Sequence, residues 1–145
     1  MPRRNKIQPP VELLAQVDLF VDLSPVELRK VVALAKPLEF SEDEEVTEEG
    51  TPGGRFHVIE SGCAKVVRGG RTVARLEPGD YFGELSLIDG CPRSASVIAC
   101  EPMKTWSIAE WNFRPLLKAD GSIAYKLLVK VIERFRTVQR SSTME

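Results

Sequence analysis

The sequence predicts an α+β domain in which short antiparallel strands, arranged as a sandwich or barrel, lie between helical ends. Three observations support this fold class. A length of 145 residues fits one domain better than two. Residues 38–108 consist of short apolar segments separated by turns rich in Gly and Pro, which is typical of antiparallel β proteins. On both sides of this region the apolar residues recur with helical spacing.

Two helices are expected before the strands. Residues 11–20 have the apolar spacing of a short helix. Ser24 can cap the free N–H groups of a second helix, Pro25 suits its first position, and Glu27 completes a capping box. We expect this helix to end before Pro37, because the residue that precedes a proline disfavours helical geometry.

The central strands are predicted from apolar runs bounded by turn residues. Gly69-Gly70 predicts a two-residue hairpin turn. The expected strands are residues 38–40, 45–48, 55–60, 64–68, 72–76, 96–100 and 103–108.

The C-terminal segment is predicted to be helical. Residues 109–117 form one short helix, and a longer one that opens near Asp120 has a wide apolar face. We place the domain at residues 9–140, with a flexible N-terminal arm at residues 1–8 and a frayed tail at residues 141–145.

Composition excludes several classes of function. A formal net charge of −1 argues against a dedicated nucleic-acid binder. No apolar run is long enough to span a membrane, and the basic N-terminus lacks the apolar stretch of a signal peptide, so we expect a cytoplasmic protein. His57 is the single histidine and is interpreted as structural, which disfavours a metal site and a histidine-dependent catalytic centre. The cysteines, Cys63, Cys91 and Cys100, contain no CxxC pair and are interpreted as buried thiols.

One segment, residues 79–97, has the chemistry of an anion site. Gly83 allows close approach of a ligand, and a short helix starting at residues 82–85 would offer free N–H groups. Arg93 suits a phosphate, because its planar fork pairs with two oxygens. Glu84 would repel a free phosphate, but it could accept a hydrogen bond from a ribose hydroxyl beside that phosphate. The alternative is that Glu84 and Arg93 form a salt bridge without any ligand.

Residues 82–97 resemble the phosphate-binding cassette of cyclic nucleotide-binding domains, which occur in the catabolite activator protein family, protein kinase regulatory subunits and nucleotide-gated channels. The upstream segment, residues 48–67, resembles the strands of that family, with Gly50 and Gly62 at turns. The spacing from Glu84 to Arg93 is similar to the kinase and channel branch. The resemblance implies an antiparallel β-roll (double-stranded and jelly-roll-like), flanking N-terminal helices and a C-terminal helix that acts as a lid.

The resemblance also implies a role for each site residue. Glu84 would accept from the ribose 2′-hydroxyl, and Arg93 would pair with the cyclic phosphate. Ser94 and backbone N–H groups near Gly83 would complete the phosphate cradle. The full expected set is Phe82, Gly83, Glu84, Leu85, Ser86, Pro92, Arg93, Ser94 and Ala95 in the cassette, Val66, Val73 and Ala74 on the pocket wall, and Arg134, Phe135 and Val138 on the lid.

The expected function is a cyclic nucleotide sensor that binds cAMP in preference to cGMP and does no chemistry on it. Its output would be movement of the C-terminal helix, which is also a candidate surface for a homodimer or a separate output protein. No cofactor, metal or nucleic-acid partner is expected. The alternative is an interaction or dimerisation module that keeps the fold without using the pocket. The sequence leaves open a stand-alone protein or a piece of a longer chain, and a start at Met1 favours the first.

Overall fold

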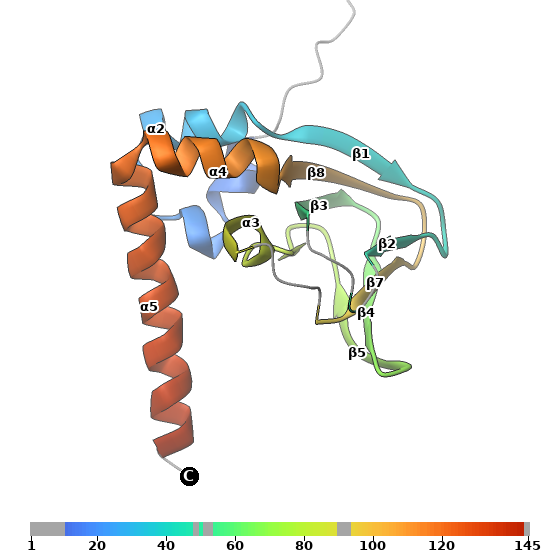
Figure 1. The fold of residues 1–145 in the computed structure, drawn as a ribbon. Coiled ribbons are helices and arrows are strands. Elements are labelled where there is room, and N and C mark those ends of the chain that lie inside the picture. Colours follow the sequence, from blue (N-terminus) through green and yellow to red (C-terminus); the bar gives the residue numbers. More distant parts are fainter. Residues whose placement is uncertain (1–10, 48–49, 51–53, 90–93, 144–145) are drawn as a thin grey trace, which may run out of the picture.

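The computed structural model describes residues 11–47, 50, 54–89 and 94–143. The chain begins with α1 (Val11–Ala15), the 3₁₀ turn η1 (Asp18–Phe20) and α2 (Pro25–Val32). The predicted capping box at the start of α2 is confirmed, because Ser24 Oγ accepts from Glu27 N and Glu27 Oε1 accepts from Ser24 N. These helices gather at one end of the molecule, and the strands occupy the other end (Figure 1).

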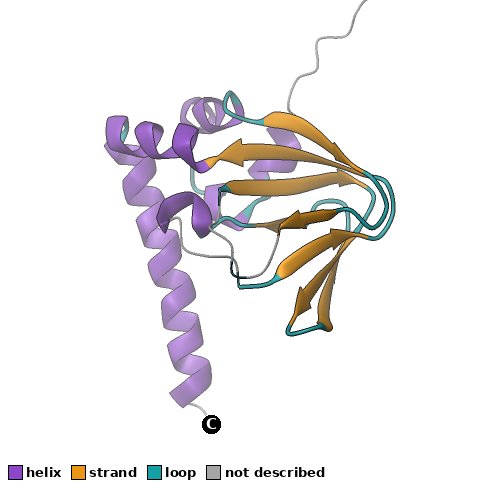
Figure 2. Ribbon diagram, turned by 45° about the vertical axis from the view of Figure 1, so that its right-hand side comes forward, coloured by secondary structure: helices purple, strands orange, loops and turns teal. Residues whose placement is uncertain are grey.

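The strands form two four-stranded antiparallel sheets, which confirms the β-roll (Figure 2). One sheet has the order β1-β8-β3-β6 and the other has the order β2-β7-β4-β5. The strand bounds are β1 Lys36–Phe40, β2 Glu45–Thr47, β3 Arg55–Ser61, β4 Ala64–Arg68, β5 Arg71–Leu76, β6 Tyr81–Phe82, β7 Ser96–Ala99 and β8 Met103–Ala109. The predicted Gly69-Gly70 hairpin joins β4 to β5, with Arg68 opposite Arg71.

Two cores stabilise this arrangement. The larger core packs the N-terminal helices, α4 and the base of α5 against the first sheet, around Phe20, Phe56, Trp106 and Phe113. The smaller core lies between the two sheets and includes Phe82. Because apolar side chains fill both faces of the first sheet, that sheet can fix the position of the segment after β6.

The segment after β6 differs from its prediction. A helix was expected to begin at residues 82–85, but Phe82 ends β6, opposite His57 in β3, and α3 starts later (Ser86–Asp89). The ladder hydrogen bonds to β3 hold residue 82 extended, which outweighs its local preference. Gly83 then adopts φ +85°, a left-handed conformation that suits glycine and turns the chain out of the sheet.

Two helices end the chain. α4 spans Glu110–Ala119 and α5 spans Gly121–Thr143. α5 runs beside the roll and extends away from it toward the C-terminus (Figure 1). Within the described residues, no helix combines the length and the apolar character that crossing a membrane requires.

Candidate functional site

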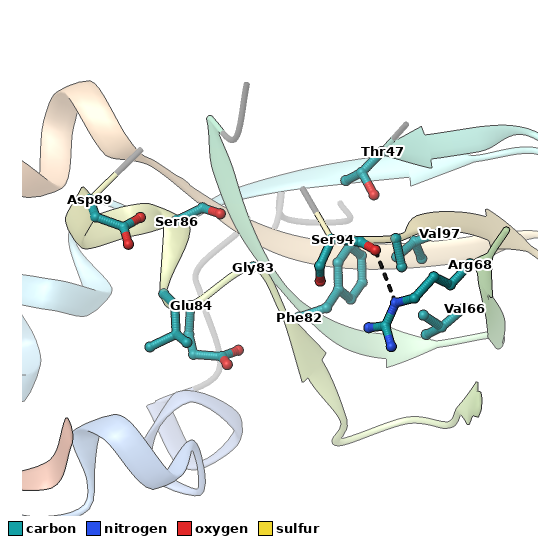
Figure 3. Close-up of a pocket in the computed structure, with 12 residues that line it drawn as sticks. Thr47, Val66, Arg68, Phe82, Gly83, Glu84, Ser86, Asp89, Ser94 and Val97 are labelled. Carbon is teal, nitrogen blue, oxygen red and sulfur yellow. Dashed lines mark hydrogen bonds between the residues drawn. The ribbon is translucent and has the colours of Figure 1, made fainter. Parts of the chain in front are cut away.

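A cavity of about 340 Å³ lies where the second sheet meets the segment between β6 and α3. Its lining comes from separate parts of the chain that the fold brings together (Figure 3). The lining residues are Thr47, Val66, Arg68, Phe82, Gly83, Glu84, Leu85, Ser86, Asp89, Ser94, Ala95 and Val97. A larger cavity of about 630 Å³, lined in part by Phe40 and Met103, lies away from this segment.

The apolar wall of the first cavity is built by the strands. Val66 in β4 lies opposite Val97 in β7, and both side chains line the cavity. Phe82 is positioned by His57, whose ring stacks on it at a centroid distance of 4.9 Å. His57 is buried, and its Nδ1 lies 3.0 Å from Thr105 Oγ1, so the histidine is held within the core as the sequence predicted. A ligand base or sugar would meet a surface that is already formed.

Glu84 places a carboxylate at this cavity. Its side chain is 19% exposed, and Oε1 lies 3.5 Å from Arg134 Nη1 of α5. The same guanidinium donates from Nε to Asp18 Oδ2 in η1 at 3.2 Å. A distance of 3.5 Å is long for a charge-assisted hydrogen bond, which is typically about 2.7–2.9 Å. Glu84 therefore retains the capacity to accept a stronger bond from a ligand hydroxyl.

Arg68 supplies a cation at the rim of the cavity. It ends β4, and its Nε donates to the carbonyl oxygen of Ser94 at 3.0 Å (Figure 3). This bond ties the β4–β5 hairpin to the segment that enters β7. Four lining residues were not predicted from the sequence: Arg68, Thr47, Asp89 and Val97. Only the hairpin position of Arg68, beside the pocket strand at Val66, could have indicated it.

The structure brings most of the predicted cassette residues together. Phe82, Gly83, Glu84, Leu85, Ser86, Ser94 and Ala95 line the cavity, as does Val66 of the predicted wall. Val73 and Ala74 are not among the lining residues. They belong to the edge strand β5, where Ala74 lies beside Val66 and farther out in the sheet. Pro92 and Arg93 lie outside the described residues, so the pairing of Arg93 with phosphate stays a prediction.

The predicted lid residues lie on α5 and do not line the cavity. Arg134 reaches Glu84, as described above. Phe135 is 60% exposed and Val138 is 63% exposed. Among the described residues, the printed link between α5 and the cavity lining is therefore the ion pair of Arg134 with Glu84.

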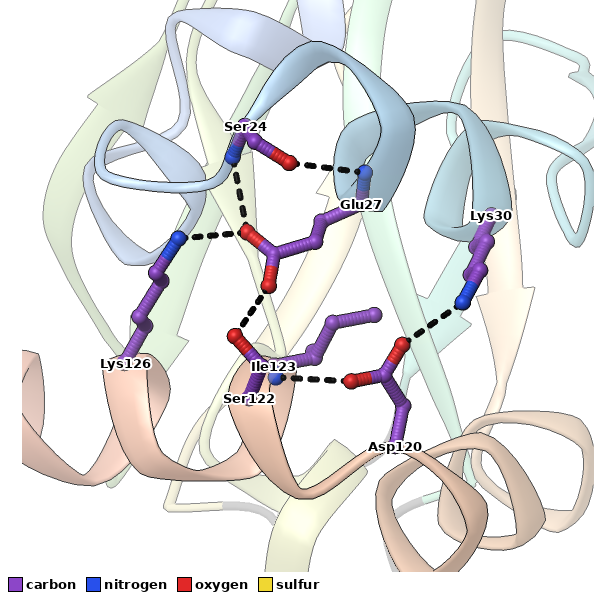
Figure 4. A network of polar contacts seen from close by, with 7 residues as sticks. All are labelled: Ser24, Glu27, Lys30, Asp120, Ser122, Ile123 and Lys126. Atoms are coloured by element: carbon purple, nitrogen blue, oxygen red, sulfur yellow. Dashed lines mark hydrogen bonds and ion pairs between the residues drawn. The ribbon is translucent and has the colours of Figure 1, made fainter.

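The base of α5 is attached to α2 by a polar network (Figure 4). Glu27 Oε1 accepts from Lys126 Nζ at 2.6 Å, and Ser122 Oγ donates to Glu27 Oε2. The hydrogen bond from Lys126, followed by that from Ser122, lowers the pKa of Glu27 from 4.5 to about 2. A capping residue of α2 thus also anchors the C-terminal helix.

A second ion pair in the same network fixes the start of α5. Asp120 Oδ2 pairs with Lys30 Nζ at 2.8 Å, and its Oδ1 accepts from Ile123 N at 3.2 Å. The pKa of Asp120 is lowered, first by the Lys30 hydrogen bond.

In the part of the chain that the structure describes, no group of three or more His, Cys, Asp or Glu side chains could hold a metal ion.

Comparison with known proteins relates the chain to cyclic nucleotide-binding proteins. Residues 37–120 match the cyclic nucleotide-binding domain family. The chain is 35% identical over 104 residues to the cAMP-dependent protein kinase regulatory subunit of Hypocrea atroviridis, and 37% identical over 106 residues to that of Emericella nidulans. Each match covers 72% of this chain, but only 22% and 26% of the respective relatives. The chain therefore spans about a quarter of the length of these relatives.

Solved structures give the same fold. The N-terminal domain of a transcriptional regulator from Streptomyces coelicolor A3(2) has a TM-score of 0.80 at 27% identity, covering 87% of this chain and 94% of that one. Thermus thermophilus catabolite activator protein has a TM-score of 0.70 at 26% identity, covering 88% of this chain and 62% of that one. With the family match over residues 37–120, the cavity and its carboxylate, these similarities identify the chain as a member of the cyclic nucleotide-binding domain family.

Proposed function

We propose that this domain is a non-catalytic sensor that binds a cyclic nucleotide, with cAMP preferred over cGMP, in the cavity beside Glu84. The observation that carries the proposal is a mostly buried carboxylate at that cavity whose ion-pair partner among the described residues, Arg134, lies at a long 3.5 Å. A ribose 2′-hydroxyl would donate to Glu84, and Arg93 would pair with the cyclic phosphate. The preference for cAMP is supported by the similarity to cAMP-dependent protein kinase regulatory subunits.

Signalling would begin with competition for Glu84. When the ribose hydroxyl donates to this carboxylate, the long contact from Arg134 is replaced, and Arg134 keeps only its bond to Asp18. Ligand can shift α5 only by its differential affinity for two positions of the helix. The contact between Arg134 and Glu84 supplies such a difference, because it is present only when the ligand is not bound to Glu84. The outer half of α5, residues 132–140, would then move over the nucleobase of the ligand as a lid.

Calorimetric titration of the whole chain tests this proposal. The wild type should bind cAMP more tightly than cGMP. Arg93→Ala should lose about 30-fold or more in affinity, since truncating one partner of a buried charge pair costs about 2–5 kcal/mol.

The 2′-deoxy analogue of cAMP should bind about tenfold more weakly to wild type, because it leaves Glu84 unpaired, and Glu84→Gln should narrow that gap. Equal affinities of the wild type for cAMP and for its 2′-deoxy analogue would contradict the role of Glu84.

A second candidate function, a dimerisation module, is supported by an exposed apolar stripe on α5. Tyr125, Leu128, Ile132 and Phe135 recur at alternating intervals of three and four residues, and each is at least 41% exposed. This spacing is that of a coiled-coil seam, so the occupant that fits it best is α5 of a second copy. Light scattering on the wild type and on Phe135→Glu would decide. We expect a dimer that dissociates in the variant, and a monomeric wild type at high protein concentration would reject the dimer. The absence of any ligand binding together with a stable dimer would favour this module over the sensor.

A further inference from the structure

Two cysteines that are distant in the sequence face each other beyond the ends of β4 and β7. The last pair of the β4–β7 ladder is Ala64 opposite Ala99, so Cys63 and Cys100 form the next pair outward. Cys100 N donates to the carbonyl oxygen of Cys63 at 2.9 Å, which extends the ladder to this pair. Opposed residues of an antiparallel pair have Cα atoms about 4.5–5.5 Å apart, within the range of about 4.4–6.8 Å that a disulfide requires.

The two thiols lie on the outer face of the sheet. Side chains alternate between the faces of a strand, and Ala64 and Ala99 are fully buried in the core between the sheets. Cys63 and Cys100 therefore point to the opposite face. Both are free thiols, Cys63 buried and Cys100 partly exposed. Burial, followed by a hydrogen bond with the Cys100 side chain, raises the pKa of the Cys63 thiol.

A cation contacts one thiol of the pair. Arg75 Nη2 donates to Cys63 Sγ at 3.3 Å, from a side chain that is 63% exposed. The positive charge of Arg75 opposes part of the rise in the pKa of Cys63 that burial causes, and so favours the thiolate, which is the form that reacts with oxidants and disulfides. The pair thus combines facing backbone positions, a partly exposed sulfur and a local positive charge.

We propose that Cys63 and Cys100 are a redox-active dithiol that a hydroperoxide converts to a disulfide, joining the ends of β4 and β7. In the first step the Cys100 thiol gives up its proton and the resulting thiolate attacks the peroxide. The O–O bond breaks, a sulfenic acid forms, and the alkoxide or hydroxide that leaves takes up that proton as alcohol or water. Cys63 sulfur then attacks Cys100 sulfur, the S–O bond breaks, and the hydroxide leaves as water with the Cys63 proton. In total, two thiols lose two electrons to one peroxide.

The disulfide would leave the nucleotide cavity open. Val66 and Val97, which line the cavity, form a pair on these same two strands, and Ala64 and Ala99 separate that pair from the cysteines along the ladder. The covalent ring closed by the bond contains the whole cassette. We therefore expect oxidation to raise the midpoint of thermal unfolding by about 5 °C or more, and to change ligand affinity by less than about threefold.

Trypsin separates the cysteines cleanly, so peptide mapping of the whole chain tests this directly. Cleavage after Lys and Arg places Cys63 in peptide 56–65, Cys91 in peptide 76–93 and Cys100 in peptide 94–104. After treatment with hydrogen peroxide and then alkylation, we expect peptides 56–65 and 94–104 to be joined by a bond that dithiothreitol cleaves. We expect Cys91 to stay reduced and therefore to be alkylated. Cys91→Ser is the matched control and should give the same linked peptide.

Substitution of the pair and of its cation completes the test. Cys63→Ser and Cys100→Ser should each abolish the linked peptide and the rise in thermal stability, and Arg75→Gln should slow its formation several-fold. A disulfide that joins Cys91 to either cysteine, or three thiols that all remain alkylatable in wild type after peroxide, would overturn the proposal. The wild-type mapping decides this even if a serine variant fails to fold.

Discussion

The base of α5, residues 121–131, and its outer half, residues 132–140, belong to one helix but are held by different interactions. At the base, Ile123 and Leu127 are at most 2% exposed and join the larger core, while Glu27 and Asp120 tie the first turns to α2. From residue 132 to 140, none of the residues is buried. Here Arg134 supplies an ion-pair contact with Glu84 at the cavity.

This difference separates stability from signalling. Burial of apolar area stabilises the base permanently, whereas exposed ion pairs contribute about 1 kcal/mol or less and are easily exchanged for other partners. In the proposed sensor, the base would act as a fixed hinge and the outer half would change position when the site is occupied.

The largest effect is expected from paired truncations of α5. Leu127→Ala should lower the free energy of unfolding by about 2–5 kcal/mol, because it removes a buried side chain and leaves a cavity. Phe135→Ala, the matched truncation in the outer half, should change it by about 0.5 kcal/mol or less. Urea denaturation of both variants at low protein concentration measures the two values. Equal destabilisation by the two variants would mean that both halves are docked alike.

The next prediction concerns acid stability at the base. The pKa of Glu27 is lower in the folded state than its ordinary value of 4.5, so its stabilising contribution is fully present above about pH 4.5 and is lost as pH falls toward 2. Glu27→Gln should remove this part of the acid-induced loss of stability, and it should also lower stability at pH 7. Denaturation curves at several pH values compare the two proteins.

Lys126→Gln is the control for this pH dependence. It removes the largest cause of the lowered pKa of Glu27 and keeps the bond from Ser122, so its acid profile should fall between those of wild type and Glu27→Gln. Asp120 remains in all three proteins, so differences among the curves report Glu27 alone. Identical acid profiles for wild type and Glu27→Gln would rule out the network as a source of stability.

A smaller effect is expected in amide hydrogen exchange along α5. Saturating cAMP should increase protection most in residues 132–140, where ligand would order the helix, and should change residues 121–131 little. Exchange in the two halves is measured with and without ligand by mass spectrometry. If the outer half exchanges identically in both states while calorimetry shows full occupancy, the lid mechanism fails and the signal must leave through the N-terminal helices.

The smallest effect is expected from loss of the competing cation. Arg134→Ala should raise the affinity for cAMP by up to about fivefold, because the ribose hydroxyl would no longer displace a partly exposed ion pair. Arg136→Ala, on the same helix, is the matched control and should leave the affinity unchanged. A large loss of affinity in Arg134→Ala would instead make Arg134 a ligand contact.

Features that depend on neighbouring residues were predictable from the sequence. The capping box at Ser24 and Glu27 and the turn at Gly69-Gly70 are confirmed, because each involves residues close enough along the chain to interact in a single local conformation. The cassette was recognised for a related reason, since its residues at 82–97 are nearly contiguous. Where β6 replaced the expected start of a helix, pairing with His57 outweighed local preference.

The tertiary structure decided every relation between distant segments. The sequence marked Glu27 as a helix cap and Glu84 as a ligand residue, but their contacts with Lys126 and Arg134 exist only because α5 packs beside α2 and η1. The pairing of β4 with its neighbouring strands places Arg68 at the cavity and brings Cys63 opposite Cys100. No residue pattern encodes which strands become neighbours, because that choice depends on how the whole chain buries its apolar surface. The family and the local turns and caps were thus predictable from neighbouring residues, the roles of the cassette residues stay predictions, and the contacts of Glu27, Glu84 and the two cysteines depend on the packing of distant segments.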